Sequence, residues 1–252
     1  MIKFFRRIRQ NLLSEGKTSK YFKYAIGEII LVVIGILIAL QINNWNEGRL
    51  EVVQESKILR NLKNDFKNNR KMLDSAIVKT KEGIQFSLEM LNYTGEKNTL
   101  SHAYQFDSII NKIFITPSFN PVNGTLNEIM NSGQLVIISN EELRKLLAVW
   151  PAVMQKVYSR FEETENFENL LNNYMIKNGN WLNADEVSTA KRSMTLPKSG
   201  FKTDNRDLLN DLEFENLIEN IAIGLDNYLA MLTEVNVLLK AIESLMNSEI
   251  KE

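Results

Sequence analysis

The amino-acid sequence predicts an all-α protein in which an N-terminal transmembrane helix continues into an elongated antiparallel helical bundle, with three long helices and short connecting helices. Three observations support this prediction. An apolar run occupies positions 25–42, near the start of the chain. Beyond it, apolar residues recur at spacings of three and four, the period of one face of an α-helix. Only four prolines occur among 252 residues, so few positions interrupt the helical pattern.

The apolar run, AIGEIILVVIGILIALQI, has the length and composition of a single membrane-spanning helix. At about 1.5 Å per residue it spans roughly 27 Å, close to the ~30 Å hydrocarbon core of a bilayer. A cleavable signal peptide is the alternative, but its apolar region would be shorter. Because no small-x-small cleavage pattern precedes the helix-compatible Ala39-Leu40-Gln41, we expect an uncleaved anchor at 25–42.

The segment 1–24 is strongly basic, with seven lysines and arginines and one acid. Because basic residues resist translocation, this imbalance predicts a cytoplasmic N-terminus and a periplasmic domain at 43–252, anchored in a bacterial inner membrane. Within the segment, Arg6 and Arg7 are interleaved with apolar residues, a pattern that can lie as an amphipathic helix on anionic lipid. Membrane lipid is therefore an expected partner.

The composition of the chain excludes several classes of protein. Without cysteine it has no disulfide scaffold, lipoprotein anchor or thiolate metal site, which fits a periplasmic location. Lysine and arginine number 30 against 31 acids, and because seven of those bases precede the apolar run, the remainder is mildly acidic. A nucleic-acid-binding domain would present a basic face, so nucleic acid is not an expected partner.

The apolar run carries a candidate interface for another membrane helix. Glu28, Gly35 and Ala39 fall near one stripe because they are separated by seven and four residues. Small residues such as Gly35 and Ala39 let two helix backbones approach closely, which is how membrane helices often associate.

Basic and aromatic side chains mark the expected membrane boundaries. Six residues are candidate anchors there: Arg6, Arg7, Lys20, Lys23, Tyr24 and Trp45. Two interpretations of Glu28 stay open, because an acid in an apolar run needs a partner, water or the interface. Its side chain either reaches the cytoplasmic boundary, near the lysines and the tyrosine, or contacts another helix inside the membrane.

The first long helix is expected from about Asn46 to Tyr93, as a direct continuation of the anchor. Its apolar face is formed by residues at helical spacing, namely Leu59, Leu62, Phe66, Leu73, Ile77, Ile84, Leu88 and Leu91. The loop TGEKNT at 94–99 should end this helix, and a shorter one should cover 100–114. Two prolines and a glycine in 116–124 then disfavour a helix.

Two capping boxes of the form S/T-x-x-E predict the next helix starts: Thr125 with Glu128, and Ser139 with Glu142. Gly133 would close the first of these helices as a C-terminal cap. The segment 135–138 between them is expected to be a brief apolar linker or a strand-like piece.

Two further long helices complete the predicted bundle. The first covers 141–178, with a kink or local opening at Pro151 and an apolar face interrupted by Thr164 and Glu168. A long loop should follow at 179–205. The last helix, 213–248, has a strict heptad: Ile218, Ile221, Leu225, Tyr228, Leu232, Val235, Leu239, Ile242 and Met246. An intramolecular bundle is the more economical arrangement of these helices, and an intermolecular coiled coil is the alternative.

Residues that carry common catalytic chemistry are scarce. Histidine occurs once, as His102, so neither a His-rich metal site nor a Ser-His-Asp triad can form. Carboxylate pairs recur as on solvated helix faces, and no Gly-rich phosphate loop is present. We therefore expect no enzymatic activity, no metal and no cofactor, while a small-ligand pocket between helices stays open.

Three segments carry a resemblance to a known family: RRIRQNLLSEGKTSKYFKYAIGEI, LVVIGILIALQINNWNE and, later, NSGQLVIISNEELRKLL. Residues 1–49 are similar, almost word for word, to the N-terminal signature of small single-pass inner-membrane proteins of unknown function from Gram-negative bacteria. The likeness is diffuse beyond them. The resemblance implies a mostly helical inner-membrane protein without assigned catalytic residues, and it makes Glu28, Gly35 and Trp45 part of a family motif.

These observations favour a noncatalytic, membrane-anchored envelope protein that acts as a scaffold, assembly or regulatory subunit. Its expected partner is another protein or its own copies, bound through the transmembrane stripe or the bundle. The alternative is a periplasmic bundle that senses a ligand. Because only 1–24 would lie in the cytoplasm, such a sensor would need a separate membrane partner to signal.

Overall fold

The computed structural model describes residues 18–114 and 118–249, and all regular elements within them are helical. Three helices are long: α2 (Thr18–Leu91), α5 (Glu141–Asn178) and α7 (Leu212–Glu249). The others are short: α3 (Ala103–Ile113), α4 (Gly124–Asn131), α6 (Trp181–Glu186) and the 3-10 helices η1 (Gln134–Ile137) and η2 (Asn205–Asn210). The predicted all-α class is confirmed.

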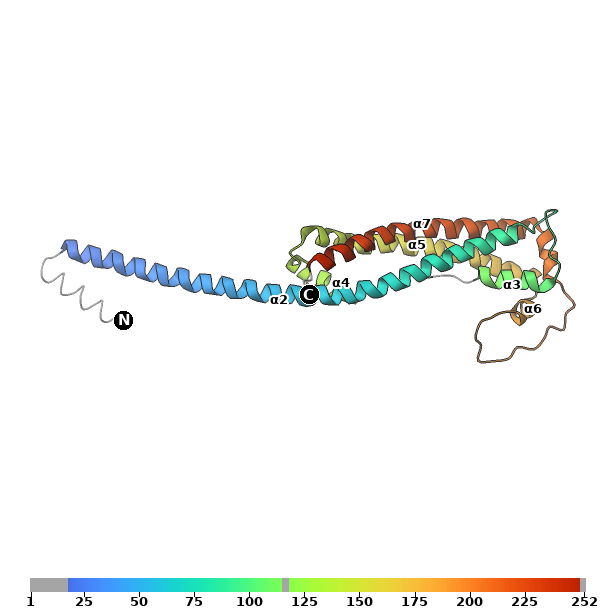
Figure 1. The fold of residues 1–252 in the computed structure, drawn as a ribbon, viewed down its shortest axis with the longest axis horizontal. Coiled ribbons are helices and arrows are strands. Elements are labelled where there is room, and N and C mark those ends of the chain that lie inside the picture. Colours follow the sequence, from blue (N-terminus) through green and yellow to red (C-terminus); the bar gives the residue numbers. More distant parts are fainter. Residues whose placement is uncertain (1–17, 115–117, 250–252) are drawn as a thin grey trace. The chain divides into compact units, whose positions relative to one another are not determined.

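The chain comprises two compact units, Met1–Lys57 and Ile58–Glu252, and the boundary falls inside α2. The apolar run and the first bundle helix thus belong to one helix, as the sequence predicts. The second unit contains the bundle, in which α2, α5 and α7 lie side by side (Figure 1).

Two hydrophobic cores show how the chain runs through the bundle. The first contains Leu62 of α2, Trp150 of α5 and Leu239 of α7. The second contains Met90, Leu171 and Phe214 of the same three helices. Hence α2 and α5 both run from the first core to the second, and α7 runs back. The connection through α3 and α4 returns the chain to the first core, which is why α2 and α5 are parallel and α7 is antiparallel to both.

Each long helix buries one stripe of residues at alternating spacings of three and four. On α7 the nine predicted heptad residues are all at most 1% exposed. Other parts of the same chain therefore cover the apolar stripe of α7. On α2 the alternation is unbroken from Leu59 to Met90, but it passes through Asn69, Thr80 and Ser87. The buried stripe of α2 is therefore more polar than the predicted apolar face.

Local hydrogen bonds make these buried polar residues compatible with the core. The hydroxyl of Thr80 donates to the carbonyl of Ala76 at 2.7 Å, and that of Ser87 to Gly83 at 2.9 Å. A hydroxyl paired with its own helix leaves no unsatisfied donor. The amide of Asn69 donates to the carbonyl of Val122 at 3.0 Å and accepts its N–H at 2.7 Å, which fixes the connection before α4.

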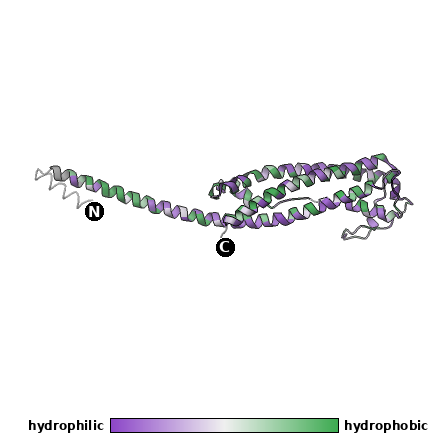
Figure 2. Ribbon diagram, turned by 45° about the horizontal axis from the view of Figure 1, so that its top comes forward, coloured by the Kyte–Doolittle hydropathy of each residue, from purple (hydrophilic) through white to green (hydrophobic). Residues whose placement is uncertain are grey.

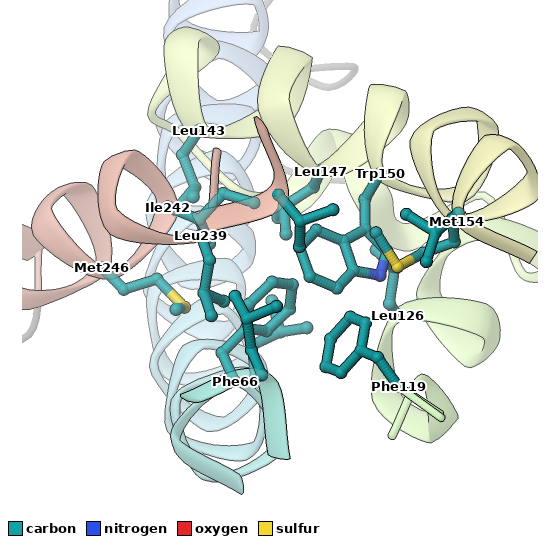
Figure 3. Close-up of a cluster of buried hydrophobic side chains, with 14 of the residues drawn as sticks. Phe66, Phe119, Leu126, Leu143, Leu147, Trp150, Met154, Leu239, Ile242 and Met246 are labelled. Carbon is teal, nitrogen blue, oxygen red and sulfur yellow. The ribbon is translucent and has the colours of Figure 1, made fainter. Parts of the chain in front are cut away.

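The first core is built around aromatic side chains from distant parts of the chain (Figure 3). The rings of Phe66 and Trp150 lie 4.9 Å apart between centroids. The indole N–H of Trp150 donates to Asn123 at 2.9 Å, so its polar group is paired while the ring is buried. The backbone N–H of Phe119 donates to the hydroxyl of Tyr228 at 3.0 Å, which ties the connecting segment to α7.

Several predicted details of the helix ends are wrong. The N-cap of α4 is Asn123 rather than Thr125. The N-cap of α5 is Asn140 rather than Ser139, because the Asn140 side chain accepts the N–H of Leu143 at 2.9 Å. Asparagine is as favourable as serine at an N-cap, so the capping-box pattern places the N-cap of α5 one residue too early. Gly133 does follow α4 in the left-handed region, with φ 71°, as a C-terminal cap requires.

Two segments and one residue also differ from their predicted structure. Residues 134–137 form the 3-10 helix η1 instead of a linker or strand-like piece. The expected loop at 179–205 contains α6. Leu88, assigned to the apolar face of α2, is 52% exposed, since the buried stripe passes through Gly83 and Ser87. A Cβ at Gly83 would lie 3.0 Å from the side chain of Leu225, so a larger residue there would have to displace that leucine.

Matched leucine substitutions on α2 test this register. Leu73→Ala should lower the free energy of unfolding by about 2–5 kcal/mol, because Leu73 is fully buried in the first core. Leu88→Ala should change it by no more than about 0.5 kcal/mol. Urea unfolding of the full chain in detergent measures both, and similar losses for the two variants would contradict the register.

Candidate functional sites

The first candidate site is the apolar segment of α2, which belongs to the first unit. Among the described helices, α2 alone is long and apolar enough to cross a membrane, with a mean hydropathy of 2.6 in its most apolar window. None of that window is buried, and Leu31, Leu37 and Ile42 are each about 60% exposed. Most of this stretch has the hydrophobic colour in Figure 2. One apolar N-terminal helix that could span a membrane is therefore present.

The predicted interface residues lie on the surface of this segment. A Cβ added to Gly35 would meet nothing within 4 Å, so the backbone is open to close approach there. Ala39 is exposed and Glu28 is partly exposed. The stripe through these three residues stays a prediction, and the small side chains at Gly35 and Ala39 leave the room that a second helix would need.

The predicted boundary anchors are only partly described. Trp45 is 70% exposed, and Lys23 is exposed. Lys20 and Tyr24 lie within α2, whereas Arg6 and Arg7 fall outside the described residues. Just beyond the apolar run, the amide of Asn43 donates to the carboxylate of Glu47 at 2.8 Å, so polar pairing begins where the apolar run ends.

The second candidate site is a groove at the end of the bundle that holds the second core. It has a volume of about 420 Å³. One wall is a face of α5, where Glu168, Asn172 and Ile176 follow each other at intervals of one turn. Facing them are Phe114, at the end of α3, and Trp181, at the start of α6. We call this the α5–α6 groove.

The two aromatic rings of the groove are held in place by α3 and α6. Their centroids lie 5.1 Å apart, with an interplanar angle of 63°. The Asn111 amide of α3 donates to the carbonyl of Ala184 in α6 at 2.6 Å, which joins the two helices behind the rings. Asn180 caps α6 by accepting the N–H of Asn183 at 3.3 Å. The rings are thus positioned by hydrogen-bonded elements rather than by a free loop.

A buried polar cluster supports this end of the bundle. Asn205 is 2% exposed, and its amide donates to the Asp107 carboxylate at 2.6 Å and to the Asn180 carbonyl at 3.0 Å. Its side-chain oxygen accepts the Asn180 N–H at 2.7 Å. Burial raises the pKa of Asp107, and the hydrogen bond from Asn205 opposes that rise. One asparagine therefore links η2, α3 and the turn before α6.

A tyrosine and an aspartate join α5 to the start of α7 beside this cluster. The hydroxyl of Tyr174 donates to the carboxylate of Asp211 at 2.6 Å. Burial raises the pKa of the Tyr174 hydroxyl, and the bond to Asp211 raises it further. The same bond lowers the pKa of Asp211. At neutral pH this pair therefore holds the tyrosine protonated and the aspartate ionised.

No group of three or more His, Cys, Asp or Glu side chains within the described ranges is placed to hold a metal ion. His102 is exposed at the N-cap of α3, and its ring stacks on Tyr104 with centroids 5.4 Å apart. The lone histidine thus lies at a helix start on the surface.

Neither Glu168 nor Asn205 is among the functional residues that the sequence predicts. The sequence contains a signal for Glu168, because it is a charged residue at a position where the apolar spacing of the helix predicts a buried side chain. For Asn205 no local signal exists, since its partner Asp107 is 98 positions away.

Comparison with known proteins gives one family and nothing more specific. Residues 28–227 match a family described as "Family of unknown function (DUF6090)", a match that begins in the apolar run and ends within α7. No curated protein and no solved structure matches the chain. The predicted resemblance to a family of unknown function is confirmed, whereas the single-pass inner-membrane location and the Gram-negative origin stay predictions.

The substitution Asn205→Asp tests the buried cluster. It replaces the donor to Asp107 with a second carboxylate and should lower the free energy of unfolding by about 2–4 kcal/mol at pH 7. Above the ordinary aspartate pKa of 3.8, the folded variant would bind more protons than the unfolded one, so the loss should shrink as the pH falls. Urea unfolding at pH 7 and pH 5 measures this.

The matched control for that experiment is Asn210→Asp. Asn210 is exposed on the same 3-10 helix, so its substitution should change the free energy of unfolding by no more than about 0.5 kcal/mol at either pH. An equal loss for Asn205→Asp at pH 7 and pH 5 would contradict the role assigned to its contact with Asp107.

Proposed function

We propose that this chain, which belongs to the DUF6090 family of unknown function, is a noncatalytic membrane-anchored protein of the bacterial envelope that acts by binding another protein or a second copy of itself. One contrast carries the proposal. The bundle fills its heptad positions from within the chain, whereas the apolar segment of α2 leaves its side chains exposed. The membrane segment is therefore the surface that remains for lipid and for a partner.

The stripe through Glu28, Gly35 and Ala39 is the part of this segment assigned to a protein partner. Lipid tails are as apolar as leucine, so burial of leucine alone does not drive helices together in a membrane. Close backbone approach at small residues does, and the open surface at Gly35 permits it. A partner helix on this stripe would also offer Glu28 a polar contact two turns away from Gly35.

The charge pattern supports an orientation for this anchor. The seven basic residues before the apolar run favour a cytoplasmic N-terminus, and the bundle then lies in the periplasm. The scaffold, assembly or regulatory role fits this placement, because a protein bound through the apolar segment would be tethered to a bundle that lies in the periplasm.

A second candidate function is ligand sensing by the periplasmic bundle, and one specific observation favours it. The α5–α6 groove combines a buried carboxylate with two partly exposed aromatic rings at the end of the bundle. In this second candidate function, the bundle passes its signal to a separate membrane partner.

Substitutions on opposite faces of the apolar segment test the interface. Gly35→Leu should lower the association constant of the assembly about fivefold, because it blocks an approach worth roughly 1 kcal/mol. Val33→Leu, about half a turn away on the opposite face, should leave it unchanged. Mass photometry of complexes extracted from native membranes with their lipid gives the assembled fraction. If both variants match the wild type, the membrane stripe is not the interface.

Single-cysteine labelling tests the orientation, and the absence of native cysteine makes it direct. In intact spheroplasts, a membrane-impermeant maleimide should label Lys191→Cys, in the exposed loop after α6, and should not label Ser14→Cys until the membrane is permeabilised. The reverse pattern would contradict the proposed periplasmic bundle.

A further inference from the structure

The α5–α6 groove has the chemistry of a site for a positively charged organic ligand. We propose that it binds a small organic ammonium ion, with Glu168 as the counter-charge and the rings of Trp181 and Phe114 as aromatic contacts. This inference rests on the second of the two proposed functions, ligand sensing, for which it names the ligand class. It is independent of the membrane interface.

The sign of the charge in the groove selects a cation. Glu168 is the one charged residue in the described lining, which otherwise consists of two asparagines, an isoleucine and two aromatic residues. An anion would be repelled by this carboxylate, whereas a cation would be attracted to it. Because Glu168 is only 8% exposed, its attraction for a cation is less screened than that of a surface carboxylate.

The aromatic rings explain why the cation should be organic. An ammonium group within about 6 Å of a ring face is attracted by the negative charge of that face, most strongly at tryptophan. The ring planes of Trp181 and Phe114 are inclined to each other by 63°, so one ligand can contact two ring surfaces that point in different directions. Ile176, 62% exposed at the same groove, offers an apolar contact for alkyl groups. A hydrated metal ion would use none of these contacts.

The size and rigidity of the groove suit a small ligand. Its volume of about 420 Å³ falls within the range of roughly 300–1,000 Å³ that is usual for small-molecule sites. Asn169 and Asn172 line it, and the side-chain amide of an asparagine has an oxygen that can accept N–H groups of an ammonium ion. The contact of Asn111 with Ala184 and the cap at Asn180 hold the opposite wall before any ligand binds.

The tryptophans give a direct binding experiment, because the chain has three and they occupy different places. The full chain is labelled with 5-fluorotryptophan in maltoside detergent and titrated with choline and with n-butylammonium at constant ionic strength. The fluorine resonance of Trp181 should shift saturably with at least one of them, while that of Trp150, fully buried in the first core, stays in place. The neutral isostere of choline, 3,3-dimethyl-1-butanol, should bind at least tenfold more weakly.

Matched variants then assign the counter-charge. Glu168→Gln should raise the dissociation constant of the ammonium ion about tenfold or more, because it removes the charge and keeps the shape. Glu165→Gln, exposed on the same helix, should leave it unchanged. No shift of Trp181 with either cation, or equal binding of the neutral isostere to the wild type, would overturn the proposal, and the isostere comparison needs no variant to fold.

The resonance of Trp45 separates this inference from the sensing function. Trp45 lies directly after the apolar run, so a signal that reaches the membrane should change its environment when the ligand binds. A shift at Trp181 without one at Trp45 would establish binding and contradict sensing. A missing shift at Trp181 would overturn the binding proposal itself.

Discussion

The alternating three- and four-residue spacing shared by α2, α5 and α7 is the constraint on which the bundle depends. It brings one stripe of each long helix into a common seam, and on α7 every heptad position of that stripe is closed to solvent. The seam tolerates polar residues when their hydrogen bonds are met locally, as Thr80 and Ser87 show. It tolerates a close helix contact where Gly83 leaves room for Leu225. Register, rather than apolar composition alone, thus decides which residues are buried.

This distinction explains how much of the fold the sequence could predict. The bounds of α5 and the heptad of α7 could be predicted, because their apolar positions repeat over many turns. The second half of the α2 stripe could not, since glycine, threonine and serine occupy positions that a hydrophobic pattern skips, and the pattern predicts that Leu88 is buried instead. The caps at Asn123 and Asn140 were missed by one or two residues, because serine and threonine nearby matched the same local pattern.

The candidate sites divide in the same way. The apolar run at 25–42 could be recognised from its length and composition, since a membrane segment is a continuous signal. The α5–α6 groove could not, because its walls come from three helices and its support depends on Asn205, whose contacts reach Asp107 and Asn180 across the fold. Glu168 belongs partly to each group. The sequence shows a charged residue at an apolar position of the helix, but it does not predict which aromatic rings lie opposite that residue in the fold.

The central functional claim is that one face of the apolar segment meets a protein and the other meets lipid. A photo-crosslinking amino acid placed at Ala39, and separately at Leu37 on the opposite face, tests this in native membranes without assuming whether the partner is a second copy or another protein. Irradiation should yield a discrete protein adduct, resolved by gel and identified by mass spectrometry, from position 39 and only lipid adducts from position 37. Equal yields from both positions, or lipid adducts alone, would contradict the account.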